Sequence, residues 1–279
     1  MNLTDYNYIT DLLSRNNFRF SKSMGQNFLI ESWVPQRIAD EANLCDSDTV
    51  VEVGPGIGCL TRELSQRAGR VVSYELDKTL MPVLAETLCG CENVEVVFRD
   101  FMKDDNIPGG KFVANIPYNI TTPLITKVIK CGFDDIVIMI QKEVAKRICS
   151  NCGEEDYSSF GIMCQWYTEP EILFDVPKEC FMPRPKVTSA VIRMKRREAA
   201  PVEVIDEDLM FRIIRSAFNF RRKTLTNALS SGMGIDKEQS SAVLEKLNLD
   251  TKVRGEALSI VEFAQISDEL STLSNCNLS

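Results

Sequence analysis

Short, uninterrupted runs of apolar residues alternate with stretches of helical periodicity from residue 49 onward. Runs of this kind, rich in Val and Ile and bounded by polar turns, are typical of parallel strands that are buried on both faces. The runs are residues 49–54, 70–77, 94–100, 112–118 and 135–141. The helical stretches are residues 56–69, 78–88, 122–132 and 142–149. This alternation predicts an α/β fold built on a doubly wound, Rossmann-like parallel sheet.

The pattern changes near residue 198, where an acidic, proline-containing segment, EAAPVEVIDED, begins. Only helical signals follow this segment. Two capping-box patterns predict helix starts there, Asp236 with Gln239 and Ser259 with Glu262. We therefore expect two domains, a Rossmann-like domain over residues 1–198 and a small all-helical domain over residues 199–279.

The composition is that of an ordinary globular protein, with 44% hydrophobic and 26% charged residues. The chain has no apolar run near the roughly 18 residues of a membrane span, and its start, MNLTDYNYITDLL, has no signal-peptide pattern. We expect a cytoplasmic protein, not bound to membranes, with its ten cysteines reduced. A thiolate metal site at Cys149, Cys152, Cys89 and Cys91 is the alternative, but no second CxxC stands at zinc-ribbon spacing, so we expect no metal.

Charge is distributed unevenly along the chain. The net charge of −8 argues mildly against a nucleic-acid partner. However, residues 184–197 carry six basic and no acidic groups, and residues 212–223 carry five more without an acidic one. These stretches indicate either an anionic partner, such as RNA, or ordinary solvated surfaces.

The ends of four expected strands carry residues suited to a nucleoside. In an open α/β sheet, ligands bind at the carboxyl ends of the strands. The first strand ends in EVGPGIG, which includes Gly54, and Glu75 follows 21 residues later, where it can accept hydrogen bonds from ribose hydroxyls. Asp100 could accept from an adenine amine, and Asn115 ends the fourth strand. The dinucleotide pattern G-x-G-x-x-G is not met, so S-adenosylmethionine is the expected ligand.

A family resemblance makes this hypothesis specific. In order, EVGPGIG, YELD, RDF and NIPY resemble the motifs of a class I methyltransferase, and NIPY resembles the group that methylates the exocyclic amine of adenine. SKSMGQNFLI at 21–30 resembles the N-terminal cofactor motif, and FMPRPKVTSAV at 181–191 resembles the F-x-P-x-P-x-V target loop. SAFNFRRKTLTNAL and RGEALSIVEF resemble the helical domain of the small-subunit (16S) rRNA adenine dimethyltransferases.

The resemblance implies roles for individual residues. Asn27 and Leu29, with help from Gln26, would line the methionine end of the cofactor. Gly54 would approach it with its main chain, Glu75 would bind the ribose and Asp100 the adenine.

The NIPY tetrapeptide would bind the target amine. The lone pair of this amine is delocalised into the adenine ring, so acceptors on its hydrogens would favour a pyramidal, nucleophilic nitrogen. The Asn115 side chain supplies one carbonyl, and the backbone of Ile116 or Pro117 supplies the other; the fixed φ of Pro117 holds this segment extended. Tyr118 would stack on a flipped-out base, with Phe181 as the second wall of the slot; the alternative for Phe181 is a place in the hydrophobic core.

The substrate implied by the resemblance is a hairpin loop near the 3′ end of small-subunit rRNA, in which two adjacent adenosines are each dimethylated in ribosome biogenesis. The partner would be naked rRNA or a partly assembled small subunit, bound by a monomer through the basic stretches. Two alternatives stay open: a large-subunit rRNA adenine methyltransferase of the macrolide-resistance type, and a non-catalytic RNA-binding assembly factor.

Overall fold

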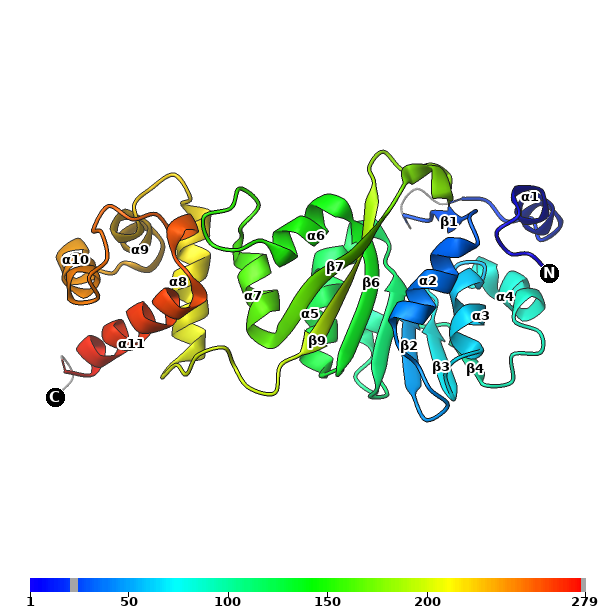
Figure 1. The fold of residues 1–279 in the computed structure, drawn as a ribbon, viewed down its shortest axis with the longest axis horizontal. Helices are drawn as coiled ribbons and strands as arrows, with labels where there is room; N and C mark the ends of the chain where they lie inside the picture. Colours follow the sequence, from blue (N-terminus) through cyan, green and yellow to red (C-terminus); the bar gives the residue numbers. More distant parts are fainter. Residues whose placement is uncertain (21–24, 277–279) are drawn as a thin grey trace. The chain divides into compact units, whose positions relative to one another are not determined.

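The structure is a computed structural model that describes residues 1–20 and 25–276. Its main sheet has seven strands in the order β4-β3-β2-β5-β6-β9-β7 (Figure 1). The pairs from β4 to β6 are parallel, β9 runs antiparallel to β6, and β7 runs antiparallel to β9. The strands are β2 (Thr49–Val53), β3 (Arg70–Tyr74), β4 (Val94–Val97), β5 (Lys111–Asn115), β6 (Asp135–Gln141), β7 (Thr168–Val176) and β9 (Ser189–Arg196). The predicted α/β fold with a Rossmann-like parallel sheet is confirmed.

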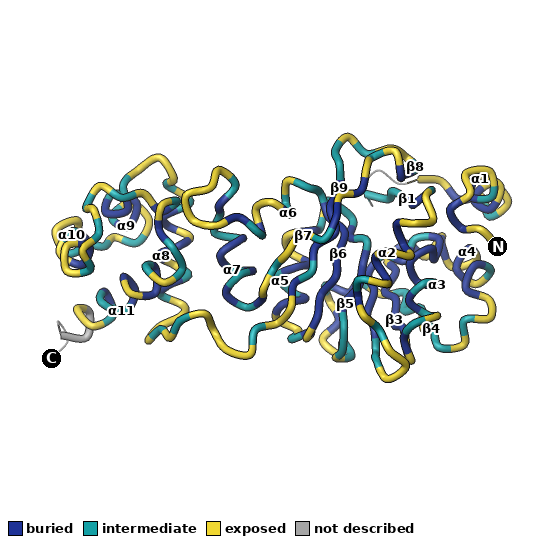
Figure 2. Tube along the Cα trace, viewed as in Figure 1, coloured by how far each residue is buried: buried dark blue, intermediate teal, exposed yellow. Residues whose placement is uncertain are grey.

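The central strands are buried on both faces, as their continuous apolar runs predict (Figure 2). Val50, Val113 and Val137 on β2, β5 and β6 are 0–1% exposed and belong to one apolar cluster with Ile38 of α2 and Leu64 of α3. The helices of this part of the chain are α1 (Tyr6–Arg15), α2 (Trp33–Glu41), α3 (Cys59–Ser65), α4 (Met81–Thr87), α5 (Thr121–Cys131) and α6 (Lys142–Cys149). Since β2 to β5 are parallel, their carboxyl ends lie at one edge of the sheet.

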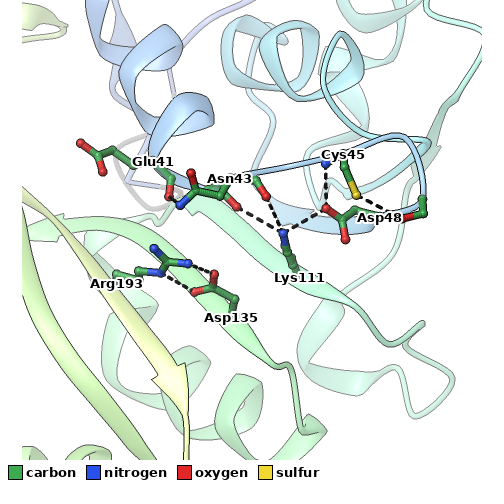
Figure 3. Close-up of polar contacts among 9 residues, drawn as sticks. Glu41, Asn43, Cys45, Asp48, Lys111, Asp135 and Arg193 are labelled. Atoms are coloured by element: carbon green, nitrogen blue, oxygen red, sulfur yellow. Dashed lines mark hydrogen bonds and ion pairs between the residues drawn. The ribbon is translucent and has the colours of Figure 1, made fainter.

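The opposite edge, at the amino ends of the strands, is held by ionic contacts (Figure 3). Lys111, the first residue of β5, donates from Nζ to the Asn43 carbonyl at 2.7 Å and lies 3.0 Å from the Asp48 carboxylate. Asp135, the first residue of β6, accepts two hydrogen bonds from the Arg193 guanidinium of β9. Charged side chains therefore have a structural role at this edge.

A small two-stranded sheet joins segments that are far apart in the sequence. β1 (Phe28–Leu29) pairs antiparallel with β8 (Phe181–Met182), so that Leu29 lies opposite Phe181. The expected N-terminal motif and the expected target loop therefore lie side by side. Residues 21–24 of that motif lie outside the described residues. The short 3₁₀ helices are η2 (Lys78–Leu80), η3 (Phe101–Lys103), η4 (Tyr118–Ile120), η5 (Lys178–Cys180) and η6 (Gly255–Ala257).

Backbone contacts divide the chain into two compact units: Met1–Ala145 with Thr168–Arg196, and Lys146–Tyr167 with Arg197–Ser279. The second unit is helical, and it takes in a stretch of chain that precedes β7 and β9 as well as the residues that follow them. Tyr157, Ile162 and Trp166 are buried with Met210 and Ile214 in its core. Its helices are α7 (Ser159–Tyr167), α8 (Glu207–Asn219), α9 (Leu225–Met233), α10 (Lys237–Lys246) and α11 (Ile260–Cys276).

The helix starts in the second unit follow the predicted capping residues. Asp236 precedes α10 and accepts hydrogen bonds from the backbone N–H groups of Glu238 and Gln239. Ser259 precedes α11, where its N–H donates to the Glu262 carboxylate at 2.7 Å, and the Glu262 N–H donates back to Ser259 Oγ at 3.3 Å. Both predicted starts are confirmed.

Candidate active site

A cavity opens at the carboxyl edge of the parallel strands. The space within it, open solvent at its mouth included, is about 1150 Å³. It brings together residues predicted from widely separated motifs: Gln26, Asn27, Leu29, Gly54, Glu75, Asp100, Asn115, Pro117 and Tyr118. Their roles toward a ligand stay predictions.

Glycine is favoured in the loop after β2 because the backbone there has a positive φ, and at Gly56 also because another side chain lies close. Gly54 has a φ of +76°, and a Cβ there would stand 3.5 Å from the Pro117 ring. At Gly56, where φ is +60°, a Cβ would stand 3.1 Å from the Phe28 ring. The loop therefore lies directly against the NIPY segment on one side and β1 on the other.

Glu75 follows β3 and lines the cavity while only 7% exposed. Burial raises the pKa of its carboxyl group above the ordinary value. The Asp77 N–H, which donates to Glu75 Oε1 at 2.8 Å, opposes this rise without cancelling it. Asp77 in turn accepts from the Gln26 amide at 2.8 Å and from the Thr79 N–H at 3.0 Å. Sequence analysis missed Asp77, which ties the N-terminal motif to the end of β3.

Asp100 stands at the rim of the cavity, after β4. Its Oδ1 accepts from the Met102 N–H at 2.9 Å and so begins η3, while its Oδ2 lies 3.8 Å from the Lys103 ammonium. The side chain is 31% exposed. The carboxylate is thus fixed in place, yet accessible to a ligand.

Glu52, on β2, is a second buried carboxyl group among the lining residues. It is 1% exposed, and its Oε2 accepts from Thr61 Oγ1 at 2.7 Å and from Ser73 Oγ at 2.6 Å. Burial raises its pKa to about 7. Glu52 therefore joins β2, α3 and β3 beneath the glycine loop, a role that the sequence does not signal.

The NIPY segment leaves the sheet at Asn115, the last residue of β5. The Ile116 N–H still donates to the Met139 carbonyl of β6, at 3.1 Å. The Pro117 carbonyl accepts from the Ile120 N–H at 3.2 Å, and the Thr121 hydroxyl lies 3.5 Å from it. No N–H or hydroxyl group of the described residues donates a hydrogen bond to the Ile116 carbonyl. Of the two backbone acceptors left open by the sequence, Pro117 therefore already accepts a hydrogen bond within the chain, and Ile116 does not.

Tyr118 begins η4 and lines the cavity. Its hydroxyl lies 2.6 Å from the hydroxyl of Ser189, the first residue of β9. Burial raises the pKa of the phenol, so the group stays protonated at neutral pH. The ring is thereby tied to the sheet through its outer end.

Phe181 is placed differently from the other predicted site residues. It lies on β8, is 3% exposed and belongs to the same apolar cluster as Phe174 and Cys180. It is absent from the described residues that line the cavity. Its role as a wall of the base slot stays a prediction, and the alternative, a place in the core, agrees with this packing.

Several cations of the two basic stretches are paired within the chain. Arg184 pairs with Glu179, Arg193 with Asp135, and Arg221 with Glu256. Arg221 also donates to the Glu155 carbonyl at 2.8 Å. Exposed cations for which the described residues offer no ion pair are Lys186, Lys195, Arg196, Arg212, Arg215, Arg222 and Lys223. Part of each stretch therefore has a structural role.

Among residues 1–20 and 25–276, no group of three His, Cys, Asp or Glu side chains is placed to hold a metal ion. In the same residues, no helix is both long and apolar enough to cross a membrane.

Comparisons with known proteins identify close relatives. The family model described as "Ribosomal RNA adenine dimethylase" matches residues 17–266. The chain is 44% identical over 273 residues to the ribosomal RNA small subunit methyltransferase A of Clostridium perfringens, with 95% of each chain covered. It is 42% identical over 278 residues to the protein of the same name in Geobacillus kaustophilus, covering 94% of this chain and 95% of that one.

Solved structures agree with the fold. A dimethyladenosine transferase from Plasmodium falciparum superposes with a TM-score of 0.77 at 26% identity, covering 88% of this chain and 98% of that one. The 23S rRNA methyltransferase ErmE superposes with a TM-score of 0.70 at 28% identity, covering 88% and 99%. ErmE is named as a 23S rRNA methyltransferase, whereas the name of the Plasmodium protein gives no RNA, so structural likeness alone does not identify a substrate for this chain.

Proposed function

Because the chain belongs to the ribosomal RNA adenine dimethylase family, we propose that it dimethylates the exocyclic amines of two adjacent adenosines in a hairpin loop near the 3′ end of small-subunit rRNA. One observation carries the proposal: a single cavity is lined both by a glycine loop with two carboxylates and by the NIPY segment. The first set suits a nucleoside-containing methyl donor, and the second suits a base amine.

The methyl donor is S-adenosylmethionine, and the polar groups that line the cavity fit it. Glu75 is a buried carboxylate beside a glycine loop, an arrangement that accepts hydrogen bonds from a ribose diol. Asp100 would accept from the adenine amine at the rim, Gly54 would approach the ligand with its main chain, and Asn27 and Leu29 would line the methionine end. When bound, S-adenosylmethionine supplies a methyl group on a positively charged sulfur.

The NIPY segment would make the target amine nucleophilic. The Asn115 side-chain carbonyl and the Ile116 backbone carbonyl would each accept one amine hydrogen, which draws the lone pair out of conjugation with the ring. Pro117 restricts the backbone of Ile116, the residue before it, to extended conformations, which limits how the Ile116 carbonyl can turn relative to Asn115. No general base is needed, because the methylated ammonium is acidic enough to lose its proton to water. The protein's contribution is mainly orientation.

Tyr118 would stack against the target base, and Phe181 would approach from the side of the target loop. The exposed cations of residues 184–197 and 212–223 would bind phosphates of the RNA, with the helical domain contributing the second group. We expect a cytoplasmic monomer acting on rRNA or on a partly assembled small subunit.

A methyltransferase of the macrolide-resistance type is the second candidate, since ErmE shares the fold. The names of the curated relatives favour the small-subunit enzyme, and these relatives are more similar to the chain than ErmE is. A non-catalytic assembly factor is disfavoured because Glu75, Asp100 and the NIPY segment are intact around one cavity.

The test is to incubate the protein with methyl-labelled S-adenosylmethionine and purified small subunits that lack the modification, and to map the labelled bases. We expect label on the exocyclic amines of two neighbouring adenosines in the 3′ hairpin. Large subunits serve as the matched control. Label confined to the large subunit would favour the second candidate, and RNA binding without label would favour the assembly factor.

A further inference from the structure

The hydroxyl of Tyr118 meets a partner that belongs neither to the cavity lining nor to NIPY. Ser189 is completely buried, its hydroxyl lies 2.6 Å from that of Tyr118, and 71 residues separate the two in the sequence. We propose that Ser189 is a positioning residue for the proposed methyl transfer, which holds the Tyr118 ring at the place where it can stack on the target base. This inference rests on the proposed function.

Ser189 is a rigid anchor for the Tyr118 ring because β9 pairs with a strand on each side at this residue. It is the first residue of β9 and lies opposite Gln141 of β6 and Val176 of β7. The neighbouring Thr188 carbonyl accepts from the Lys142 N–H at 3.0 Å. A hydroxyl held at this point of the sheet has little freedom to follow a moving partner.

The Tyr118 ring needs such an anchor because its backbone has left the sheet. η4 spans only three residues, and the ring can rotate about two side-chain torsions. A hydrogen bond to the hydroxyl oxygen fixes where the far end of the ring lies and so restricts the first of these torsions. The second torsion turns the ring about an axis that passes through this oxygen, so the bond limits it only through the direction of the O–H group. The place of the ring is therefore set before a flipped base arrives, which reduces the ordering required during the reaction.

The same bond connects the two loops that would surround the base. Ser189 ends the FMPRPKVTS segment of the expected target loop, whereas Tyr118 ends the NIPY tetrapeptide. A shift of either loop would be transmitted to the other through this contact. Ser189 therefore acts through Tyr118, without touching the substrate.

The experiment compares wild type with Ser189→Ala, Tyr118→Phe and the double variant, under single-turnover conditions on substrate subunits. Ser240→Ala is the matched control, since Ser240 is 2% exposed and its hydroxyl donates to the Asp236 carbonyl at 2.9 Å in the helical unit. Three quantities are measured for each: the methylation rate, the affinity for S-adenosylmethionine and the melting temperature. A minimal hairpin with 2-aminopurine at the target position reports stacking by fluorescence.

We expect each single variant to lower the rate about three- to tenfold, as one neutral hydrogen bond allows. The double variant should be no slower than Tyr118→Phe, because both changes remove the same bond. Affinity for S-adenosylmethionine should stay within about twofold of wild type, and the quenching of 2-aminopurine should weaken. Ser240→Ala should keep the wild-type rate.

Two results would overturn the role of Ser189: a wild-type rate in Ser189→Ala with only a lower melting temperature, or rate losses that multiply in the double variant. If Ser189→Ala does not fold, Tyr118→Phe, which keeps the ring, decides alone, and a wild-type rate there overturns the inference. A wild type that methylates nothing would overturn the proposed function together with the inference, whereas an active wild type with unaffected variants would overturn only the inference.

Discussion

At the scale of single residues, the chemistry depends on which acceptors near the cavity are already bonded. The Pro117 carbonyl already accepts from the Ile120 N–H, whereas the Ile116 carbonyl meets no donor among the described residues, which supports Ile116 as the proposed acceptor for the target amine. The sequence allowed either carbonyl, because both flank the same proline. The two carbonyls differ only in the turn into η4, where the Pro117 carbonyl accepts a hydrogen bond and the Ile116 carbonyl does not.

We predict that Asn115→Ala lowers methyl transfer by roughly a hundredfold or more, because the amine loses one of two aligned acceptors. Affinity for S-adenosylmethionine should stay within a few-fold, since Glu75 and Asp100 lie on other strand ends. Single-turnover rates and calorimetry on the same preparation check both points. A turnover near wild type would contradict the proposed role of Asn115.

Glu75→Ala should weaken binding of S-adenosylmethionine by about 1.5–3 kcal/mol, the range for a hydrogen bond to a charged group. The control is Glu95→Ala, which removes a carboxylate that is 56% exposed and paired with Arg70 on the surface. Isothermal titration calorimetry measures both variants. Equal affinity in Glu75→Ala and wild type would show that Glu75 does not bind the ribose.

At the scale of elements, Glu52 links β2, α3 and β3 through one buried carboxyl group, and its titration is a measure of that link. Its pKa is about 7, because burial disfavours the charged form, while hydrogen bonds from Ser73 and Thr61 act in the opposite direction and the Glu75 charge adds to the rise. Between its ordinary value near 4.5 and about 7, the folded protein keeps a proton that the unfolded chain has lost.

The contribution of Glu52 to the free energy of unfolding should therefore fall as the pH rises from about 4.5 to about 7, and stay constant above that. The total fall is roughly 3 kcal/mol. Glu52→Gln cannot titrate and keeps a side-chain carbonyl for Thr61 and Ser73. Urea unfolding of both proteins across this pH range gives the difference, and a difference that does not change with pH would contradict the assignment.

The elements that could be predicted from the sequence are those with strong local patterns. The Val- and Ile-rich runs of β2, β5 and β6 and the capping residues of α10 and α11 each identify an element within a few residues. β7 was missed, because an edge strand that includes Pro170 alternates buried and exposed residues weakly and is recognised only through its pairing with β9. The grouping of Lys146–Tyr167 with the C-terminal helices was missed for the same reason: it arises from packing between distant segments.

At the scale of the whole molecule, ion pairs between residues far apart in the sequence change how the charge of a basic stretch is interpreted. The basic stretch at 212–223 has no acidic residue of its own, yet Arg221 pairs with Glu256, which lies 35 residues away in the sequence. A linear count of charges cannot reveal such a partner. The net charge of −8 and an RNA-binding surface are compatible when some cations stabilise the fold and the others remain available to phosphates.

Adjacent residues in this stretch allow the two roles to be separated. Arg222 is exposed and has no ion pair within the described residues, whereas Arg221 binds Glu256 and the Glu155 carbonyl. We predict that Arg222→Ala weakens RNA binding and reduces the slope of log affinity against log salt by about 0.7, one phosphate contact to single-stranded RNA. Its melting temperature and its affinity for S-adenosylmethionine should not change.

Arg221→Ala, the matched control, should instead lower the melting temperature by a small amount, because an exposed ion pair contributes only about 0.2–1 kcal/mol and one backbone hydrogen bond is lost with it. Filter binding of the hairpin RNA at several salt concentrations, beside a melting curve for each variant, measures both effects. If Arg222→Ala keeps the wild-type salt slope and folds normally, the RNA does not contact this turn. The exposed Lys186 and Lys195 of the first basic stretch would then be the next cations to neutralise, since both lack an ion pair among the described residues.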